Sequence, residues 1–170
     1  IGHARVLIVF DLIVNWLKKI GYKVTYVRNI TDIDDKIIKK SVDEKIDVME
    51  LTNKYISYMH HDSEKLLLTS PDIEPKATEN IDEMITIISE LINKNIAYIS
   101  ENGDVYFSVE KFNDYGKLSG KTLESLMIGK RVEKNIGKKN YNDFVLWKRR
   151  KKDEPYWEAP FGDGRPGWHI

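Results

Sequence analysis

The sequence contains no cysteine, so neither a disulfide nor a thiolate metal ligand can form within these 170 residues. It also lacks an excess of either charge, because 27 Lys and Arg residues balance 27 Asp and Glu residues. No overall electrostatic field therefore draws the chain to nucleic acid or to a membrane. Any electrostatic role has to be local.

Long hydrophobic runs are missing too. The longest, Val6 to Leu17, is interrupted by Asp11 and Asn15 and is shorter than the roughly 20 apolar residues of a membrane-spanning helix. It also lacks the basic flank and cleavage site of a signal peptide. We expect a cytoplasmic protein without membrane contact. Because neither the Ile-Gly-His start nor the Trp-His-Ile end resembles a natural terminus, we expect a piece of a larger protein, truncated at both ends.

Helix and strand signals alternate at the start of the chain. Residues 3–20 have the pattern of a mostly buried helix that stops at Gly21. The β-favouring residues 23–27 follow and predict a strand. A helix followed closely by a strand indicates an α/β layer with parallel strands. Further on, Thr31 and Asp34 have the spacing of a capping box that opens a helix, and a longer helix is expected over residues 43–65.

The middle of the chain predicts a helix and a hairpin. Thr78 is expected to cap an amphipathic helix that presents Ile81, Ile85 and Ile88 on one face. The β-rich runs 97–100 and 105–109 flank Asn102-Gly103, a favoured pair in tight turns, and this pattern predicts a β-hairpin.

The last part predicts one more strand, Phe144 to Trp147, and a Gly/Pro-rich loop. We therefore predict three parts: residues 1–78 as a first α/β layer, residues 79–158 as a mixed α+β insertion, and residues 159–170 as a return towards the first layer.

Gly2 and His3 stand at the mouth of the first predicted helix. Glycine lets a ligand approach the backbone, the free N–H groups donate hydrogen bonds, and the helix dipole favours negative charge. A histidine there can donate to a phosphate oxygen as charge develops in a transition state. A helix start without any function is the alternative reading.

Residues 29–36, Asn-Ile-Thr-Asp-Ile-Asp-Asp-Lys, follow the predicted strand, where open α/β sheets bind ligands. Three carboxylates in four residues could hold a cation, but their spacing does not fit a calcium-binding loop. Helix capping, with favourable dipole interactions of roughly 0.3–1 kcal/mol per charge, is the alternative.

Residues 162–169, Gly-Asp-Gly-Arg-Pro-Gly-Trp-His, could cradle an anion around Arg165, with Trp168 as the wall of a small pocket. Simple packing explains the same pattern. The basic run 148–152 could touch RNA phosphates, or it could be a solvated face partly offset by the two acids that follow it. The adjacent pair His60-His61 is a poor chelator, because neighbouring side chains on a helix diverge.

In their order and spacing these segments resemble cysteinyl-tRNA synthetase. The strings that carry the resemblance are Gly2-His3-Ala4-Arg5, Phe10-Asp11, Tyr26 to Ile38, and Gly164 to Ile170, with weaker similarity in Glu101 to Val105 and Asp143 to Lys148. The resemblance covers the whole chain. Its most specific part is the Thr-Asp-Ile-Asp-Asp-Lys run at residues 31–36.

The resemblance implies an α/β fold, a class I Rossmann-type (HUP-like) catalytic core with a partial parallel sheet and an α+β connective insertion. It implies that cysteine and ATP, the latter with Mg²⁺, form cysteinyl-adenylate before the cysteinyl group moves to tRNA(Cys). Ile1, Gly2 and His3 would be the last three residues of the His-Ile-Gly-His signature and would bind ATP, with His3 as the catalytic residue. Thr31 and Trp168 would line the pocket for the substrate cysteine.

The resemblance also implies zinc in the complete enzyme, since a bond to the substrate thiolate separates cysteine from serine better than an apolar pocket does. The ligands that the family uses, two Cys, a His and a Glu, would lie outside residues 1–170. The expected partners are tRNA(Cys), L-cysteine and ATP, and the complete enzyme is expected to be a monomer. We expect this fragment to be inactive alone.

Two other readings stay open at this point. A related ligase makes the same adenylate but passes cysteine to an amino sugar, and a non-catalytic module could keep the same architecture. The residues that follow Ile170 would separate these readings, because only the tRNA enzyme should continue into an anticodon-binding domain.

Overall fold

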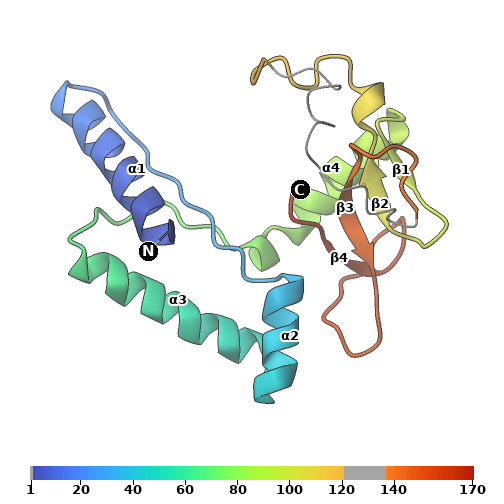
Figure 1. The fold of residues 1–170 in the computed structure, drawn as a ribbon, viewed down its shortest axis with the longest axis horizontal. Helices are drawn as coiled ribbons and strands as arrows, with labels where there is room; N and C mark the ends of the chain where they lie inside the picture. Colours follow the sequence, from blue (N-terminus) through green and yellow to red (C-terminus); the bar gives the residue numbers. More distant parts are fainter. Residues whose placement is uncertain (1, 121–136) are drawn as a thin grey trace. The chain divides into compact units, whose positions relative to one another are not determined.

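The computed structural model describes residues 2–120 and 137–170. Contacts divide the chain into two compact units, Ile1–Asn80 and Ile81–Ile170 (Figure 1). None of the helices in the described ranges is long and apolar enough to cross a membrane. The three-part division predicted from the sequence, 1–78, 79–158 and 159–170, is a functional assignment and stays a prediction.

Three α-helices dominate the first unit: α1 (Gly2–Lys19), α2 (Asp35–Glu44) and α3 (Val48–Lys65). The helix predicted over residues 3–20 is confirmed, and it ends before Gly21, whose φ is +96°. The helix predicted over residues 43–65 starts later than expected. Lys45 turns the chain with a φ of 54°, and Asp47 then caps α3 by accepting hydrogen bonds from two backbone N–H groups.

The start of α2 differs from the predicted capping box. Asp34 is the N-cap, and its Oδ1 accepts a hydrogen bond from the backbone N–H of Lys36 at 2.9 Å. Thr31 lies three residues before this cap, outside the helix. A single Asp cap suffices here because its short side chain reaches the free N–H groups of the first turn.

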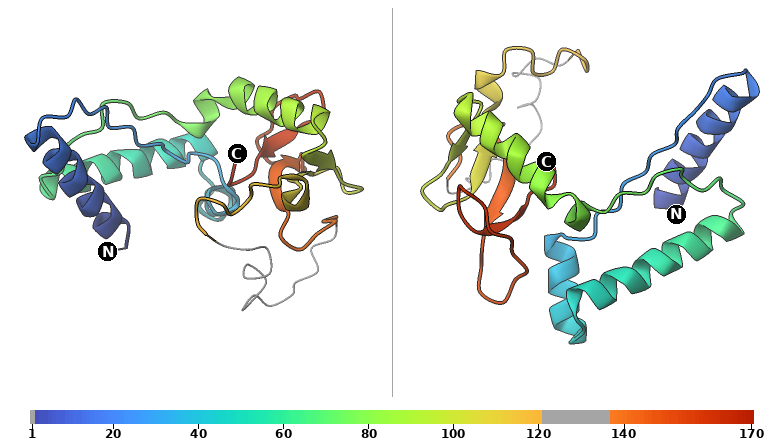
Figure 2. Two further views of the ribbon diagram at one scale, coloured as in Figure 1. Left: turned by 90° about the horizontal axis from the view of Figure 1, so that it is seen from above. Right: turned by 180° about the vertical axis from the view of Figure 1, so that it is seen from behind.

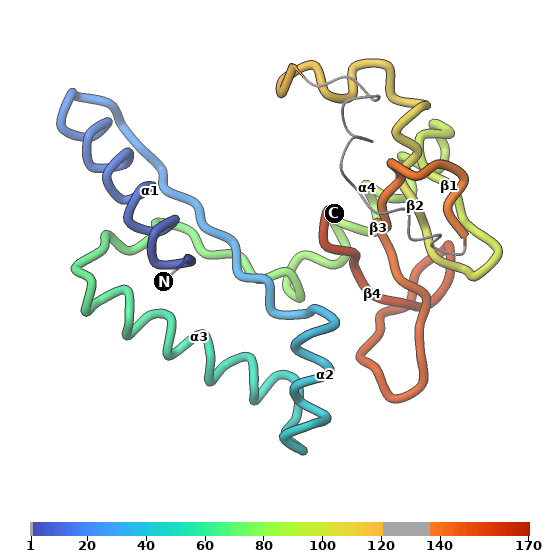
Figure 3. The backbone as a smooth tube through the Cα atoms, viewed as in Figure 1, coloured from blue at the N-terminus to red at the C-terminus, as the bar shows by residue number. Residues whose placement is uncertain are grey.

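Two extended segments, residues 26–30 and 72–77, run parallel beside each other (Figure 3). The backbone N–H of Ile30 donates to the carbonyl of Pro75 at 2.8 Å, and that of Ala77 donates back to Ile30 at 3.0 Å. The regular strand predicted over residues 23–27 is wrong, because only isolated bridges form. Pro75 supplies no N–H to the ladder and interrupts it. The parallel pairing expected for the first α/β layer is therefore present as the irregular pairing of residues 26–30 with residues 72–77.

Helix α1 was expected to be mostly buried, but only Val14 is. Leu7 and Leu17 are half-buried, and most of its other large apolar side chains are exposed, among them Val6, Val9, Phe10, Leu12 and Trp16. The described part of the first unit contains no regular sheet that could cover this face. Asp11 and Asn15 attach the helix to the chain after α3 through hydrogen bonds with Thr69.

An antiparallel sheet in the order β1-β2-β3-β4 forms the second unit, with strands β1 (Ala97–Ile99), β2 (Val105–Phe107), β3 (Phe144–Arg149) and β4 (Gly164–Pro166). Helix α4 (Ile81–Asn93) covers one face of it (Figure 2). The predicted hairpin is confirmed, with Gly103 at a φ of +85° in the turn. Short 3₁₀ helices, η1 (Ala77–Glu79) and η2 (Val109–Lys111), precede α4 and follow β2.

Strand β4 lies in the segment predicted as a loop. A Cβ on Gly164 would stand 2.1 Å from the carbonyl oxygen of Lys148, and one on Gly167 would stand 2.2 Å from that of Val145. Both glycines are therefore needed for the chain to lie this close to β3. The glycine pattern serves strand packing at these two positions.

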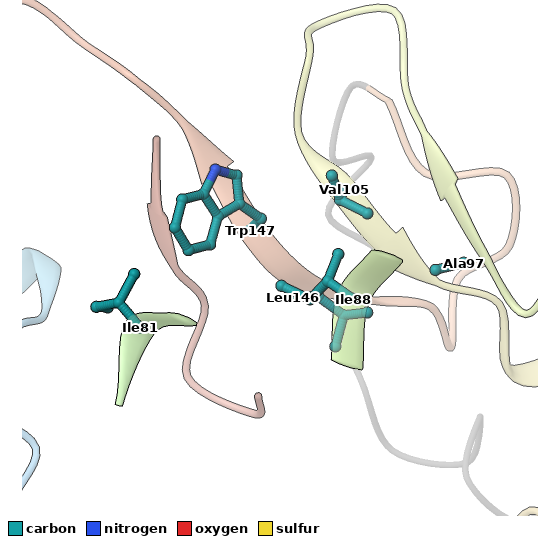
Figure 4. Packing of buried hydrophobic residues seen from close by; sticks show 6 residues of the cluster. All are labelled: Ile81, Ile88, Ala97, Val105, Leu146 and Trp147. Atoms are coloured by element: carbon teal, nitrogen blue, oxygen red, sulfur yellow. The ribbon is translucent and has the colours of Figure 1, made fainter. Parts of the chain in front are cut away.

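The core of the second unit lies between α4 and the sheet (Figure 4). Six buried residues form it: Ile81, Ile88, Ala97, Val105, Leu146 and Trp147. The apolar face predicted for α4 is thus confirmed. The predicted capping role of Thr78 is wrong, because α4 begins at Ile81 and the Thr78 hydroxyl donates to Asp32.

Candidate functional site

The first turn of α1 is open to solvent. Gly2 and His3 are both exposed there, and the turn contains no acidic residue. A Cβ added to Gly2 would meet nothing within 4 Å, so packing within the described chain does not require glycine at this position. The helix start therefore has room for an anionic ligand close to the backbone. Ile1 lies outside the described residues.

Thr31 is exposed and stands between two anchored neighbours. Ile30 bridges to the parallel segment, and Asp32 is completely buried. Asp32 Oδ1 accepts from the backbone N–H of Thr78 at 3.0 Å, and its Oδ2 accepts from the Thr78 hydroxyl. The buried carboxylate of Asp32 thus links the chain at the ends of the two extended segments. This link fixes the backbone that carries Thr31.

The three carboxylates of the 29–36 run do not converge on a cation. Asp32 bonds to Thr78, Asp34 caps α2, and Asp35 lies in the first turn of that helix. Within residues 2–120 and 137–170, no three His, Cys, Asp or Glu side chains form a metal-binding group, and the sequence has no cysteine. The described residues do not fit the zinc site that the resemblance implies. The zinc expected in the complete enzyme stays a prediction.

Glu74 links α3 to the extended segments. Its Oε1 accepts from Arg28 Nε at 2.9 Å and from Arg28 Nη2 at 2.5 Å, while its Oε2 lies 2.5 Å from His60 Nε2. Burial acts to raise the pKa of Glu74, but the hydrogen bonds and charges of Arg28 and His60 outweigh it and hold the pKa below its usual value. His60 therefore pairs with Glu74 and not with its neighbour His61.

The second unit has a surface hollow of about 460 Å³ beside the hairpin turn. It is lined by Asn102, Asp104, Tyr106, Lys138, Phe144, Val145, Lys148, Trp168 and His169. Trp168 is 65% exposed, so most of its ring surface is accessible. Two lysines, the exposed indole of Trp168 and the polar side chains of the hairpin turn thus line the same hollow.

The anion cradle considered around Arg165 is not formed. Arg165 is only 2% exposed, and its Nε donates to Glu154 Oε2 at 3.0 Å. Because the guanidinium of Arg165 is buried and hydrogen-bonded to Glu154, it stabilises the β3–β4 loop and is not accessible to an external anion. Packing is the reading that the structure supports for this segment.

The basic run 148–152 is largely engaged with its own loop. The Arg150 guanidinium lies 3.6 Å from the centre of the Tyr156 ring and 3.7 Å from an Asp163 oxygen. Lys151 Nζ stands 3.9 Å from a Glu154 oxygen. Within this run, Lys148 is the residue that lines the hollow.

Asp143 is a buried acid that the sequence reading did not single out. It is 1% exposed, and it accepts hydrogen bonds from the Tyr98 hydroxyl at 2.7 Å and from the backbone N–H groups of Val109 and Asn140, both at 3.0 Å. Burial, together with the bond to Asp143, raises the pKa of the Tyr98 hydroxyl. No local pattern marks this acid, because its partners lie up to 45 residues away.

The residues predicted as site residues lie in both units. Gly2, His3 and Thr31 belong to the first, and Trp168 belongs to the second. Each of the four is exposed on its own unit. Their convergence on one cleft stays a prediction.

Comparison with known proteins gives one consistent result. All of residues 1–170 match the family described as "tRNA synthetases class I (C) catalytic domain". A protein named "Cysteine--tRNA ligase" from Hydrogenovibrio crunogenus is 57% identical over 170 residues, which are 100% of this chain and 37% of that protein. A protein of the same name from Dechloromonas aromatica is 53% identical over the same shares. One from Neisseria meningitidis is 55% identical, with 24% of its length covered.

Proposed function

Because this chain belongs to the class I (C) tRNA synthetase catalytic-domain family, with the α/β fold class expected from its sequence, we propose that the protein containing it is a cysteine–tRNA ligase. It activates L-cysteine with ATP as cysteinyl-adenylate and transfers the cysteinyl group to tRNA(Cys). The observation that carries the proposal is 57% identity along the entire chain to a protein named for this activity. The chain spans 37% of that relative, so the reaction is proposed for the complete protein.

Within that reaction the start of α1 binds ATP. Ile1, Gly2 and His3 form the adenosine and phosphate site, and His3 donates a hydrogen bond to the phosphates as the α-phosphorus is attacked. The exposed first turn and the open space around Gly2 support this role. The carboxylate of the substrate is itself the nucleophile, so the enzyme needs no general base. Catalysis rests on positioning and on charge stabilisation.

Thr31 and Trp168 line the cysteine pocket. The buried Asp32–Thr78 bond supports this role for Thr31, because it gives the exposed side chain a fixed backbone. The 65% exposed ring of Trp168 supports a role as a pocket wall. In this arrangement residues 1–78 are the first part of the catalytic domain, residues 79–158 are the connective insertion, and residues 159–170 return to the catalytic domain.

The reaction is tested on the full-length protein by ATP–pyrophosphate exchange with each amino acid in turn, followed by charging of tRNA(Cys). We expect exchange that depends on cysteine and is far weaker with serine, and we expect cysteinyl-tRNA as the product. Transfer of cysteine to an amino sugar in place of tRNA, or no exchange with cysteine, would contradict the proposal.

Replacing Trp168 by alanine in the full-length protein should raise the KM for cysteine in the exchange reaction roughly 5- to 150-fold, because the loss of an apolar wall of the pocket costs about 1–3 kcal/mol of binding. The KM for ATP should change little. Phe112→Ala removes another exposed aromatic of the second unit and serves as the control. An unchanged KM for cysteine would remove Trp168 from the pocket.

A further inference from the structure

We propose that Asp32 and Thr78 are positioning residues for cysteine binding, because their paired side chains hold the backbone of Thr31 in its substrate-binding position. The inference rests on the proposed function, which places Thr31 in the cysteine pocket. It goes further by giving a role in substrate binding to two residues that the proposed function does not place against the substrate. Both act through Thr31 and not by contact with cysteine.

Burial along residues 30–33 is the first argument. Ile30, Asp32 and Ile33 are all buried, whereas Thr31 between them is exposed. The inward, outward, inward order of residues 30–32 is that of extended chain, in which neighbouring side chains point to opposite sides. The inward direction of Asp32 therefore sets the outward direction of Thr31, and a movement of the first side chain turns the second.

The attachment of the chain on both sides of Thr31 is the second argument. Before Thr31, the backbone N–H of Ile30 donates to the carbonyl of Pro75 at 2.8 Å. After it, the attachment is made by a side chain. The Asp32 carboxylate accepts from the backbone N–H of Thr78 at 3.0 Å and from the Thr78 hydroxyl. These two bonds continue, beyond Thr31, the link to the parallel segment that the backbone makes at Ile30.

The chemistry of the buried group is the third argument. A buried carboxylate is tolerated when it is hydrogen-bonded, and buried polar groups are one means of fixing a single arrangement of packed segments. Asp32 is 0% exposed, and both of its oxygens bond to one residue, Thr78. Because hydrogen bonds are directional and apolar contacts are not, this pair fixes how residues 30–32 lie against residues 76–78. An aspartate at this position serves the placement of Thr31.

The experiment measures cysteine-dependent ATP–pyrophosphate exchange by variants of the full-length protein. Thr78→Val removes the hydroxyl but keeps the backbone N–H and the shape of the side chain, so it perturbs folding less than removal of Asp32. It should raise the KM for cysteine roughly tenfold, as a displaced binding group does. The maximal rate and the KM for ATP should change less than about twofold, the pattern of lost substrate binding. Thr78→Ser keeps the hydroxyl and should have the wild-type KM.

The double variant Thr31→Ala/Thr78→Val separates positioning from a general structural effect. Because Thr78 acts through Thr31, the double variant should have the same KM for cysteine as Thr31→Ala alone. Such non-additivity is expected of residues that act as one unit. A structural weakening that does not pass through Thr31 would instead multiply the two effects.

Ser41→Ala is the matched control. It removes another buried hydroxyl of the first unit, one that donates to the carbonyl of Ile38 at 2.9 Å within α2, and it should leave the KM for cysteine unchanged. An unchanged KM in Thr78→Val, or multiplied effects in the double variant, would overturn the inference while the proposed function stands. Failure of the proposed function is distinguishable, because the wild type would then show no cysteine-dependent exchange.

Discussion

Replacing His3 by alanine in the full-length protein should slow cysteinyl-adenylate formation roughly 10²- to 10³-fold, the usual loss when one donor to a developing negative charge is removed. His3 lies in the exposed first turn of α1, where the backbone N–H groups already favour a phosphate. Because the imidazole acts as charge builds, the loss should fall on the rate and far less on the Kd for cysteine. Exchange of pyrophosphate with ATP, measured at saturating cysteine, checks the rate.

His61→Ala is the matched control for this variant. His61 is exposed on α3, outside the proposed site, and its removal should leave the exchange rate unchanged. A normal rate for His3→Ala would show that the role given to His3 is wrong. A parallel fall in both variants would instead point to damaged folding.

Replacing Trp147 by alanine should destabilise the second unit by about 3–5 kcal/mol, as expected for a large aromatic side chain deleted from a core. Trp147 is 0% exposed, its Nε1 donates to the carbonyl of Gly162 at 3.0 Å, and its ring meets Phe161 edge-on with the ring centres 5.6 Å apart. Its loss therefore leaves a cavity and removes this hydrogen bond between β3 and the loop that leads to β4.

Hydrogen exchange of the full-length protein measures this effect locally. Amides of β2 and β3 that exchange through opening of the unit should exchange roughly 100- to 4,000-fold faster, since each 1.4 kcal/mol is a factor of ten. Trp168→Ala makes the same substitution at a site that is 65% exposed and should leave these amides nearly unchanged. Equal exchange in both variants would mean that Trp147 does not hold the core.

Local patterns predicted the elements that local interactions stabilise. Helix α1 followed from its composition and from the stop at Gly21, and the β1–β2 hairpin followed from Asn102-Gly103, whose turn geometry is set within a few residues. The strand at residues 23–27 failed for a tertiary reason. Strand propensity was present, but within residues 23–27 only Val27 forms a bridge, and Pro75 keeps the pairing from continuing as a regular ladder between that bridge and the one at Ile30.

Two features of the candidate sites could not be read from spacing. Asp32 was grouped with its acidic neighbours as a cap or a cation ligand, whereas its real partner is Thr78, 46 residues away. Lys138 stood in a weakly patterned stretch, and the structure places it with Lys148 in the lining of one hollow. Contacts over such separations leave no periodicity in the sequence.

The sequence by itself determined the family, through the ordered strings around Gly2-His3, residues 31–36 and Gly164 to Ile170. It also determined the helices and the hairpin, which short-range hydrogen bonds define. Only the tertiary structure decided that residues 164–166 form a strand, that Asp32 is a buried tie, and that two distant lysines share a hollow with Trp168. The physical reason is that side-chain burial and long-range pairing depend on which segments meet in space, and composition alone does not specify that.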